Sequence, residues 1–491
     1  METLTDSRLL LAILAPLLGA GLVMLNGKRP NVRETCSFVA AAALFVVTAA
    51  MLPDILAGKK LHFTLFQLLP GLSISLRADA LSMVFALSAS FLWVLTVFYS
   101  AGYMRGLEEH AQTRFNACFA LALFGAMGCA FSDNLLTLYL FYEIVSICTY
   151  PLVAHHQDNE GYEGGRKYLI YLTATAKGLV LPAMVLLYVL SGSLDFADNI
   201  RSGIIPAGVH HGIVAALYAC CILGFAKNGV MPFHNWLPSA MVAPTPVSAL
   251  LHAVAVVKVG VFSTVRVMLY VFGTRLMHDL NLGLPTAYFV SFTIVVGSIV
   301  ALSKDNLKAR LAYSTVSQLS YIILGVALLT DSGIEGGLIH IANHAFSKIT
   351  LFFCAGAIYV ATHKKNISEM KGLGRVMPFT FGAFALASLS MIGAPPVAGF
   401  VTKWYLLNGA MDAHAIGIIV VLLVSTLLNA AYFAPVVYQG FFGKASEADA
   451  HDRHGEAHPA LVIPLCITAI ISVVIGLYPQ LFLNLLKHVV S

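Results

Sequence analysis

The sequence has 491 residues, of which 58% are hydrophobic and only 11% are charged, and its formal net charge is +5. A soluble globular protein carries about a quarter charged residues, so this composition excludes an ordinary soluble protein, a disordered chain and a secreted disulfide-rich scaffold. The chain also lacks a basic block with interleaved aromatic residues, which argues against a nucleic-acid partner and leaves a polytopic membrane protein.

Apolar runs recur along the whole chain. A helix needs about 20 apolar residues to cross the hydrocarbon core, and runs of this kind begin near Leu9, Phe38, Leu81, Phe115, Leu135, Tyr168, Gly212, Val247, Leu284, Leu311, Leu338, Phe379, Ala415 and Leu461. The pattern therefore predicts an all-α polytopic membrane protein with about 14 transmembrane helices. Neither a cationic segment nor an evident cleavage site accompanies the first run, so we expect it to be a span and not a removable signal.

The loops between these runs differ in their basic residues. Those after the first, third, fifth, ninth and eleventh runs are rich in lysine and arginine, namely Lys28, Arg29, Arg33, Arg105, Arg114, Arg166, Lys167, Lys304, Lys308, Arg310, Lys364, Lys365, Lys371 and Arg375. The other loops hold fewer, namely Lys59, Lys60, Arg77, Arg201 and Arg275. By the positive-inside rule, the first set faces the cytoplasm and both termini lie on the extracytoplasmic side of the cell membrane.

Ionisable residues occur inside the predicted spans, where each charge costs roughly 2.5–3.5 kcal/mol. They are Glu143, Lys177, Lys227, Lys258, Lys348 and Lys403, together with His252, His340 and His344. Left unpaired, the six charged groups would cost on the order of 15–20 kcal/mol, more than an ordinary stability margin. They must therefore pair, become neutral or face internal water, and each of these outcomes also serves a proton path.

The fifth and seventh runs hold the first two candidates. Glu143 lies near the middle of its run, and Lys227 lies beside the segment Asn228–Pro232, which contains helix-breaking residues. A broken helix places half-helix termini next to the lysine. Burial favours the neutral amine and a nearby Glu143 favours the ammonium, so Lys227 can load and release a proton. The alternatives are a static salt bridge for Glu143 and an interfacial amine for Lys227.

Later runs repeat these features. His340, His344 and Lys348 follow one another in steps of four, which places them on nearly one helix face. We interpret them as a chain of titratable groups with water in the gaps, the alternative being a polar seam that bonds neighbouring helices. Lys403 repeats the arrangement of Lys227 because it follows the break Gly393–Pro396.

The remaining candidates carry weaker signals. His252 and Lys258 are six residues apart and therefore on different faces of a helix, and His252 alone is also typical of a satisfied interior histidine. Lys177 is mid-span, where we expect it to be buried and able to pair with Glu143.

No cofactor or metal site is predicted. The eight cysteines contain no CxxC pair and are typical of small buried residues. The longest polar stretch, residues 443–459, carries histidines and aspartates that a solvated loop explains better than a metal site, namely His451, His454, His458, Asp449 and Asp452.

The positions of the two breaks predict an internal symmetry. Residues 1–112 hold helices 1–3, residues 113–270 a first five-helix repeat, residues 284–442 a second repeat, and residues 443–491 the polar loop and helix 14. An odd number of helices per repeat inverts the second repeat relative to the first. Lys227 and Lys403 then lie in the broken fourth helix of each repeat.

Four segments carry a resemblance to a known family: APTPVSALLHAVAVVKVGVF, DNLKARLAYSTVSQLSY, HIANHAFSKITLFF and GAPPVAGFVTK. From the third to the thirteenth span, the chain resembles the antiporter-like membrane subunits shared by respiratory complex I, Mrp-type sodium/proton antiporters and group 4 membrane-bound hydrogenases. We expect it to lack the lateral helix and extra domain of the largest members. We therefore expect it to be most similar to shorter ones, such as the D-like Mrp subunit.

The resemblance implies 14 helices with two inverted repeats, and a hydrated axis along which protons move, driven by redox chemistry or exchanged against sodium. It implies that functional positions of the family match Glu143, Lys227, Lys258, His340, His344, Lys348 and Lys403. Lys177 has no matched position.

We therefore expect a proton-translocating membrane subunit that works with other membrane subunits of one complex. It could serve an Mrp antiporter, a group 4 hydrogenase or a complex I-like oxidoreductase, and the sequence does not give the ion, the direction or the driving reaction. Two other classes stay open: a structural subunit with static buried ion pairs, and a polytopic membrane enzyme acting on a lipid or quinone. The sequence has no HExxH motif that would support the enzyme.

Overall fold

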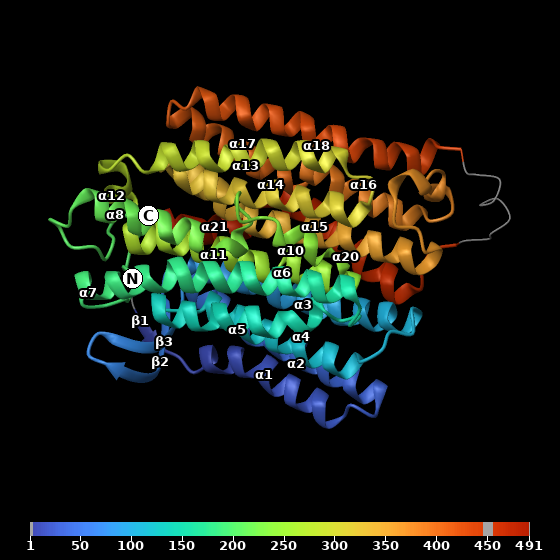
Figure 1. Ribbon diagram of the computed structural model, residues 1–491, viewed down its shortest axis with the longest axis horizontal. Helices are drawn as coiled ribbons and strands as arrows, with labels where there is room; N and C mark the ends of the chain where they lie inside the picture. The colour runs from blue at the N-terminus through green and yellow to red at the C-terminus, as the bar shows by residue number, and fades with distance from the viewer. Residues whose placement is uncertain (1–2, 445–454, 491) are drawn as a thin grey trace.

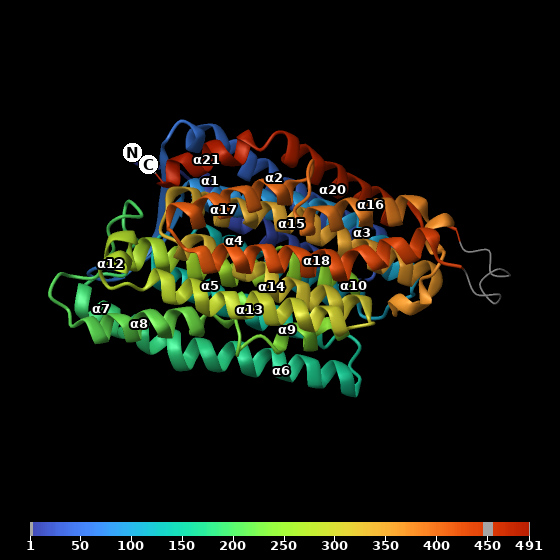
Figure 2. The same ribbon diagram turned by 90° about the horizontal axis from the view of Figure 1, so that it is seen from above.

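The computed structural model describes residues 3–444 and 455–490, except for the side chains of residues 251–253. Most of the described chain forms helices that lie side by side along the longest axis of the molecule (Figures 1 and 2). The α-helices are α1 (Arg8–Leu25), α2 (Pro30–Leu56), α3 (Ala80–Gly106), α4 (Gln112–Ala130), α5 (Leu135–Val153), α6 (Asn159–Thr175), α7 (Leu181–Ser191), α8 (His211–Gly224), α9 (Trp236–Ser239), α10 (Thr245–Ala253), α11 (Val256–Val267), α12 (Thr274–Asp279), α13 (Gly283–Ser303), α14 (Leu307–Ala327), α15 (Asp331–Thr362), α16 (Pro378–Ile392), α17 (Ala398–Asp412), α18 (Ile416–Phe442), α20 (Pro459–Leu477) and α21 (Gln480–Val490).

Shorter helical turns connect several of these helices. Two are π-helical, η1 (Ala176–Val180) and η4 (Met268–Phe272), and the others are single 3₁₀ turns, η2 (Ala226–Asn228), η3 (Ala240–Val242), η5 (Ile367–Glu369) and η6 (Leu373–Arg375). The π-turn η1 joins α6 and α7 into one continuous helix, Asn159–Ser191.

Ten helices in the described part of the chain are long and apolar enough to cross a membrane. They are α1 to α5, the continuous helix Asn159–Ser191, and α13, α15, α18 and α20. Two shorter apolar helices, α8 and α16, each end where a predicted span is interrupted. The chain is therefore a multi-pass membrane protein, as its composition predicts. The finer count of 14 spans stays a prediction.

A small sheet departs from the predicted all-α fold. Strand β1 (Thr3–Thr5) pairs in parallel with β2 (Lys60–Leu69), and β2 pairs in antiparallel with β3 (Leu72–Ala78), in the order β1-β2-β3. Lys59, Lys60 and Arg77 of this region are predicted to lie in a loop between two spans. The turn residues Pro70 and Gly71, with Gly71 at a φ of +73°, were the available signal for a hairpin.

Polar residues at the start of apolar runs fix where the helices begin. The side chain of Asp79 accepts a hydrogen bond from the Ser82 N–H at the start of α3, and that of Asn134 accepts one from the Thr137 N–H at the start of α5. Such N-caps satisfy main-chain donors that have no partner inside the helix. The first residues of α3 and of α5, which carries Glu143, are therefore fixed by side-chain caps.

Both termini lie at one end of the molecule (Figure 1). Thr3 pairs with Lys60 in the sheet, and Nε2 of His488 in α21 lies 3.1 Å from the main-chain oxygen of Leu56. This arrangement agrees with the expectation that both ends emerge on the same side of the membrane. Which side that is stays a prediction.

Candidate functional site

Lys227 lies at an interruption in the seventh predicted span. α8 ends before it, it forms part of the 3₁₀ turn η2, and the next α-helix is the short α9. Its side chain is fully buried. The amine donates to the main-chain oxygen of Tyr142 at 2.9 Å and to Oγ of Ser146 at 2.6 Å, and it lies 3.1 Å from the centroid of the Tyr142 ring. Helix α5 therefore holds the amine at the break.

Neighbouring side chains satisfy the main-chain groups that the break leaves free. Nδ2 of Asn228 donates to the carbonyl of Ile222 at 2.9 Å, and its Oδ1 accepts from the N–H of Val230 at 2.9 Å. Nε1 of Trp236 donates to the carbonyl of Ala226 at 2.9 Å. Irregular backbone inside a membrane needs such partners from protein or water, so these contacts make the break a defined structure.

Helix α11 packs directly on the break at Gly260. A Cβ at this position would lie 2.2 Å from the carbonyl carbon of Lys227 and 2.2 Å from the main-chain nitrogen of Asn228. The same helix carries Lys258, which is fully buried and whose Nζ makes no hydrogen bond to a described protein atom. The absence of a side chain at Gly260 thus brings the helix that carries one lysine against the turn that carries the other.

Glu143 lies on α5, beside the residue that binds Lys227. Its side chain is partly buried, and Oε1 has no hydrogen-bond partner among the described residues. The carboxylate interacts electrostatically with Lys227 and Lys177. It forms an ion pair with neither of them in the described structure, so the static salt bridge considered for Glu143 is not formed.

Lys177 does not occupy the predicted buried position. It lies in the π-turn η1, and its side chain is exposed. The helices on either side of this turn, α6 and α7, lie along one edge of the molecule (Figure 2). The prediction was wrong because hydropathy places a residue along a span but does not say which side of the helix faces outwards. π-turns inside α-helices are frequent at functional sites.

Helix α15 carries three buried candidates. The rings of His340 and His344 have centroids 5.7 Å apart. Nδ1 of His340 lies 3.2 Å from Oγ1 of Thr402, and Nζ of Lys348 donates to Oγ of Ser314 at 2.8 Å. Neither ring nitrogen of His344 has a hydrogen-bond partner among the described residues. The helix therefore presents anchored groups on either side of an unanchored imidazole.

Lys403 lies near a second interruption. α16 ends at Ile392 and α17 begins at Ala398. The amine of Lys403 reaches back to donate to the carbonyl of Ile392 at 2.6 Å and also donates to Oγ1 of Thr426 at 2.7 Å. Like Lys227, this lysine binds polar groups of a neighbouring helix beside a broken one.

Five candidates lie in one region, and four of them, Lys258, His340, His344 and Lys348, are buried. His340 interacts electrostatically with Lys258, Lys348 and Lys403, and His344 interacts with Lys258 and Lys348. They come from α11, α15 and α17, which are distant in sequence. The fold therefore brings these titratable groups together, although the sequence places them on three separate runs.

Glu143 and Lys227 form a second group. Their side chains interact with each other, and the link between this group and the five-residue region is the packing of Gly260 on the break. His252 lies in α10, but its side chain is outside the described residues. His451, His454 and the two loop aspartates Asp449 and Asp452 also lie outside them.

Sequence reasoning missed a buried ion pair between α11 and the start of α3. Nη1 of Arg266 lies 2.5 Å from Oδ2 of Asp79, and its Nη2 lies 2.9 Å from Oδ1. Arg266 is fully buried and its guanidinium also binds the hydroxyl of Ser82 at 2.9 Å. The signal was an arginine inside the apolar run that follows Lys258, which the cost of intramembrane charge should have singled out.

Known proteins are similar to this chain in sequence. A family profile described as NADH:quinone oxidoreductase/Mrp antiporter, TM, matches residues 132–429, and one described as NADH-ubiquinone oxidoreductase (complex I), chain 5 N-terminus, matches residues 70–116. NADH-quinone oxidoreductase subunit N of Desulforudis audaxviator is 31% identical over 477 residues and covers 94% of each chain. The A/B subunit of a probable K⁺/H⁺ antiporter of Rhizobium meliloti is 31% identical over 90% of this chain, which spans 44% of that protein.

A solved structure is similar over nearly the whole chain. A chain of the membrane-bound sulfane sulfur reductase, an archaeal respiratory membrane complex, matches 99% of this chain and 98% of its own with a TM-score of 0.88 and 22% identity. At that identity the likeness shows a shared fold.

The first family profile covers all nine candidate residues, from Glu143 to Lys403.

Proposed function

The chain belongs to the NADH:quinone oxidoreductase/Mrp antiporter family, and from this premise we propose that it is a proton-translocating membrane subunit of a multi-subunit complex. Relatives include one subunit of an NADH-quinone oxidoreductase, one of a probable K⁺/H⁺ antiporter and a chain of a respiratory membrane complex. All three are parts of larger assemblies, which supports other membrane subunits as partners of this chain.

The observation that carries the proposal is a set of buried nitrogen atoms without fixed protein partners. Lys258 and His344 are fully buried on different helices, and their side-chain nitrogens make no hydrogen bond to a described protein atom. An unsatisfied buried polar group costs about 1–3 kcal/mol, which a static structural role would avoid by pairing. Groups that exchange protons with internal water need no fixed partner, and this favours conduction over a polar seam.

The proposed route runs through the membrane interior. Glu143 sets the charge of Lys227, which passes protons across the break to Lys258 on α11. The route continues over α15 to the second break. Its members are Glu143, Lys227, Lys258, His344, His340, Lys348 and Lys403, with His252 as a further member.

The two breaks support an inverted repeat. Each amine donates to a main-chain oxygen of another helix beside an interrupted span, Tyr142 for Lys227 and Ile392 for Lys403. We assign the repeats to residues 113–270 and 284–442, with five helices each within a 14-helix fold. Discontinuous helices at matching places in two inverted units are typical of ion-binding sites in transporters.

Orientation and partner contacts belong to the same proposal. We assign the end opposite to the termini to the cytoplasm, because the loops at that end are the richer in lysine and arginine. Lys177 is a charged residue in the middle of a spanning helix and is exposed on this chain. Because a charge facing lipid at that depth is costly, we assign this face to contact with another membrane subunit.

Two processes could drive proton movement in the complex, namely electron transfer and cation exchange. The relatives include subunits of both a redox enzyme and a cation/proton antiporter, so the complex either couples protons to electron transfer or exchanges them against a cation. We predict that this chain binds no redox cofactor. Proton movement measured with and without sodium or potassium, in the absence of an electron donor, separates the two.

The test uses the whole complex reconstituted in liposomes with a pH-sensitive dye inside. Lys227→Ala and Glu143→Ala should each abolish proton movement while the complex keeps its subunit composition. Lys28→Ala, at an exposed lysine between α1 and α2, is the matched control. Loss of assembly in either variant would favour the structural role, and proton movement at the normal rate would overturn the proposed route.

A further inference from the structure

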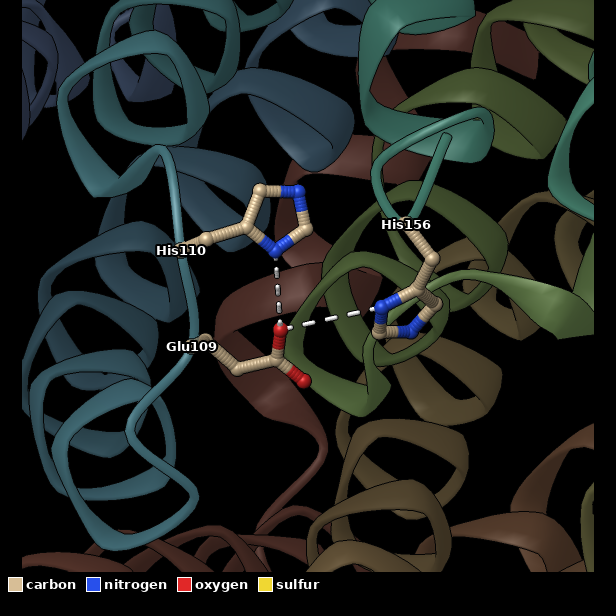
Figure 3. Close-up of side chains that lie close together, drawn as sticks. All are labelled: Glu109, His110 and His156. Atoms are coloured by element: carbon tan, nitrogen blue, oxygen red, sulfur yellow. Dashed lines mark ion pairs between the residues drawn. The ribbon is translucent and has the colours of Figure 1, made fainter. Parts of the chain in front are cut away.

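A cluster of titratable side chains lies outside the membrane interior, at the end of the molecule opposite to the termini. Glu109 and His110 are in the turn between α3 and α4, and His155 and His156 follow α5. Figure 3 shows the Glu109 carboxylate between the rings of His110 and His156. Two loops that are 45 residues apart in sequence thus meet at one carboxylate.

The distances fit a set of metal ligands. Oε2 of Glu109 lies 3.6 Å from Nε2 of His155, 3.7 Å from Nδ1 of His156 and 3.9 Å from Nδ1 of His110. The ligand atoms of Glu109, His110 and His156 all lie within 4.8 Å of one another. A tetrahedral zinc ion with bonds of about 2.0–2.2 Å separates its ligand atoms by about 3.3–3.6 Å, so small side-chain rotations would close the site.

His155 gives independent support for a ligand. Its side chain is fully buried, and neither ring nitrogen makes a hydrogen bond to a described protein atom. Its main-chain oxygen accepts a hydrogen bond from Arg114 at 2.8 Å, which fixes the loop. A buried imidazole normally has a partner for each nitrogen, and the Glu109 carboxylate lies 3.6 Å from Nε2 of this one.

The cluster borders a cavity of about 530 Å³. Glu109 and His156 line it, the latter with a side chain that is 35% exposed, and it reaches Tyr103 and Thr245, whose hydroxyl groups are 3.2 Å apart and buried. Thr245 is the first residue of α10, which leads into α11 and Lys258. An ion held by the cluster would therefore lie between solvent and the helices that carry the proposed route.

We propose that Glu109, His110, His155 and His156 form a zinc-binding site at the opening of this cavity, and that bound zinc obstructs proton uptake through it. Imidazole and carboxylate groups are the ligands that zinc takes in proteins, and one carboxylate with neutral imidazoles leaves a net negative site for a divalent cation. The second part rests on the proposed function, because it requires protons to use this cavity.

Binding is tested on the purified complex without a histidine tag, in a background where His451, His454 and His458 are changed to alanine so that the 443–459 stretch does not contribute. Isothermal titration with ZnCl₂ should show one site per chain. Glu109→Gln and His156→Ala should each weaken it by at least about tenfold. His278→Ala, at a histidine that is 84% exposed, is the control, and thermal unfolding without zinc checks that each variant is folded.

Transport gives the second readout. Zinc at saturating concentration should slow proton movement in the complex and should not slow it in the doubly substituted Glu109→Gln/His156→Ala complex. If the wild type and these variants bind zinc with the same affinity, the proposed site is wrong. Binding without slower transport overturns the obstruction. A complex that moves no protons even without zinc contradicts the proposed function alone, since the titration does not depend on transport.

Discussion

The amine of Lys403 lies 2.6 Å from the carbonyl oxygen of Ile392, the last residue of α16. The last carbonyls of a helix have no partner inside it and carry the negative end of the helix dipole. The second acceptor of the amine is a neutral hydroxyl, that of Thr426. Neither hydrogen-bond acceptor of the amine is a carboxylate. The negative end of the broken helix α16 therefore supplies the electrostatic stabilisation of this lysine.

This relationship predicts the effect of removing the amine. Lys403→Met should reduce proton movement by about a hundredfold or more, the range expected when a proton-transfer group is lost. Thr426→Ala keeps the amine and its bond to Ile392, so its rate should change by less than about tenfold. Both are measured with the dye assay on the reconstituted complex, and wild-type transport by Lys403→Met would remove this residue from the route.

The contact between α11 and the first break predicts a sharp difference between two glycines. Gly260→Ala places a methyl group 2.2 Å from main-chain atoms that cannot move aside, and overpacking of this kind costs about 1–3 kcal/mol. Gly382→Ala, inside α16, meets no atom within 4 Å and is the control. Thermal unfolding in detergent should show a lower Tm for the first variant only. Equal Tm values for the two variants would mean that the break and α11 are not in contact.

Much of the candidate site follows from the cost of charge in a membrane. Lys227, Lys258 and Lys348 stand out because a charge in an apolar run is expensive. The breaks beside Lys227 and Lys403 stand out because glycine and proline interrupt helices. These rules act on a residue and its immediate neighbours, which is the information that one sequence contains.

Other features depend on which faces of distant segments meet. The outward direction of Lys177 and the hydroxyl that Ser146 offers to Lys227 follow from helix packing, which periodicity does not give. The site around Glu109 and His155 joins two loops whose residues are typical of solvated turns. The hairpin β2–β3 was not predicted, because it is a short segment between the long apolar runs of α2 and α3.

The sheet predicts a pH dependence of stability. Nε2 of His62 lies 3.1 Å from Oδ2 of Asp133, and this hydrogen bond raises the pKa of His62 above its ordinary value. Burial alone would raise the pKa of Asp133, but the hydrogen bond from His62 and the charge of Arg77 hold this pKa below its ordinary value. The histidine's contribution is therefore complete below about pH 6.5 and is lost as pH rises through its raised pKa, whereas the aspartate's is complete above about pH 4 and is lost as pH falls through its lowered pKa.

His62→Gln should therefore lower the unfolding free energy by about 0.5 kcal/mol near pH 5.5, the value for a partly exposed pair. The difference from wild type should shrink as the pH rises towards 9, because wild-type His62 becomes neutral. Thermal unfolding of the detergent-solubilised protein at several pH values measures this. His278→Gln is the exposed control and should follow the wild type throughout; a pH-independent difference for His62→Gln would rule out the titration as its cause.

The buried pair of Arg266 and Asp79 predicts the largest loss of stability. Asp79→Asn preserves the cap of α3, because asparagine also accepts from the Ser82 N–H, but it leaves the Arg266 guanidinium buried without a carboxylate. Breaking a buried pair on one side costs about 3–5 kcal/mol, whereas replacing both partners with uncharged groups costs much less. The double variant Asp79→Asn/Arg266→Met should therefore recover much of the Tm lost by Asp79→Asn. Asp412→Asn, at an exposed carboxylate at the end of α17, should leave the Tm unchanged. If the double variant unfolds at a lower temperature than Asp79→Asn, the loss comes from packing around Arg266 and not from its unpaired charge.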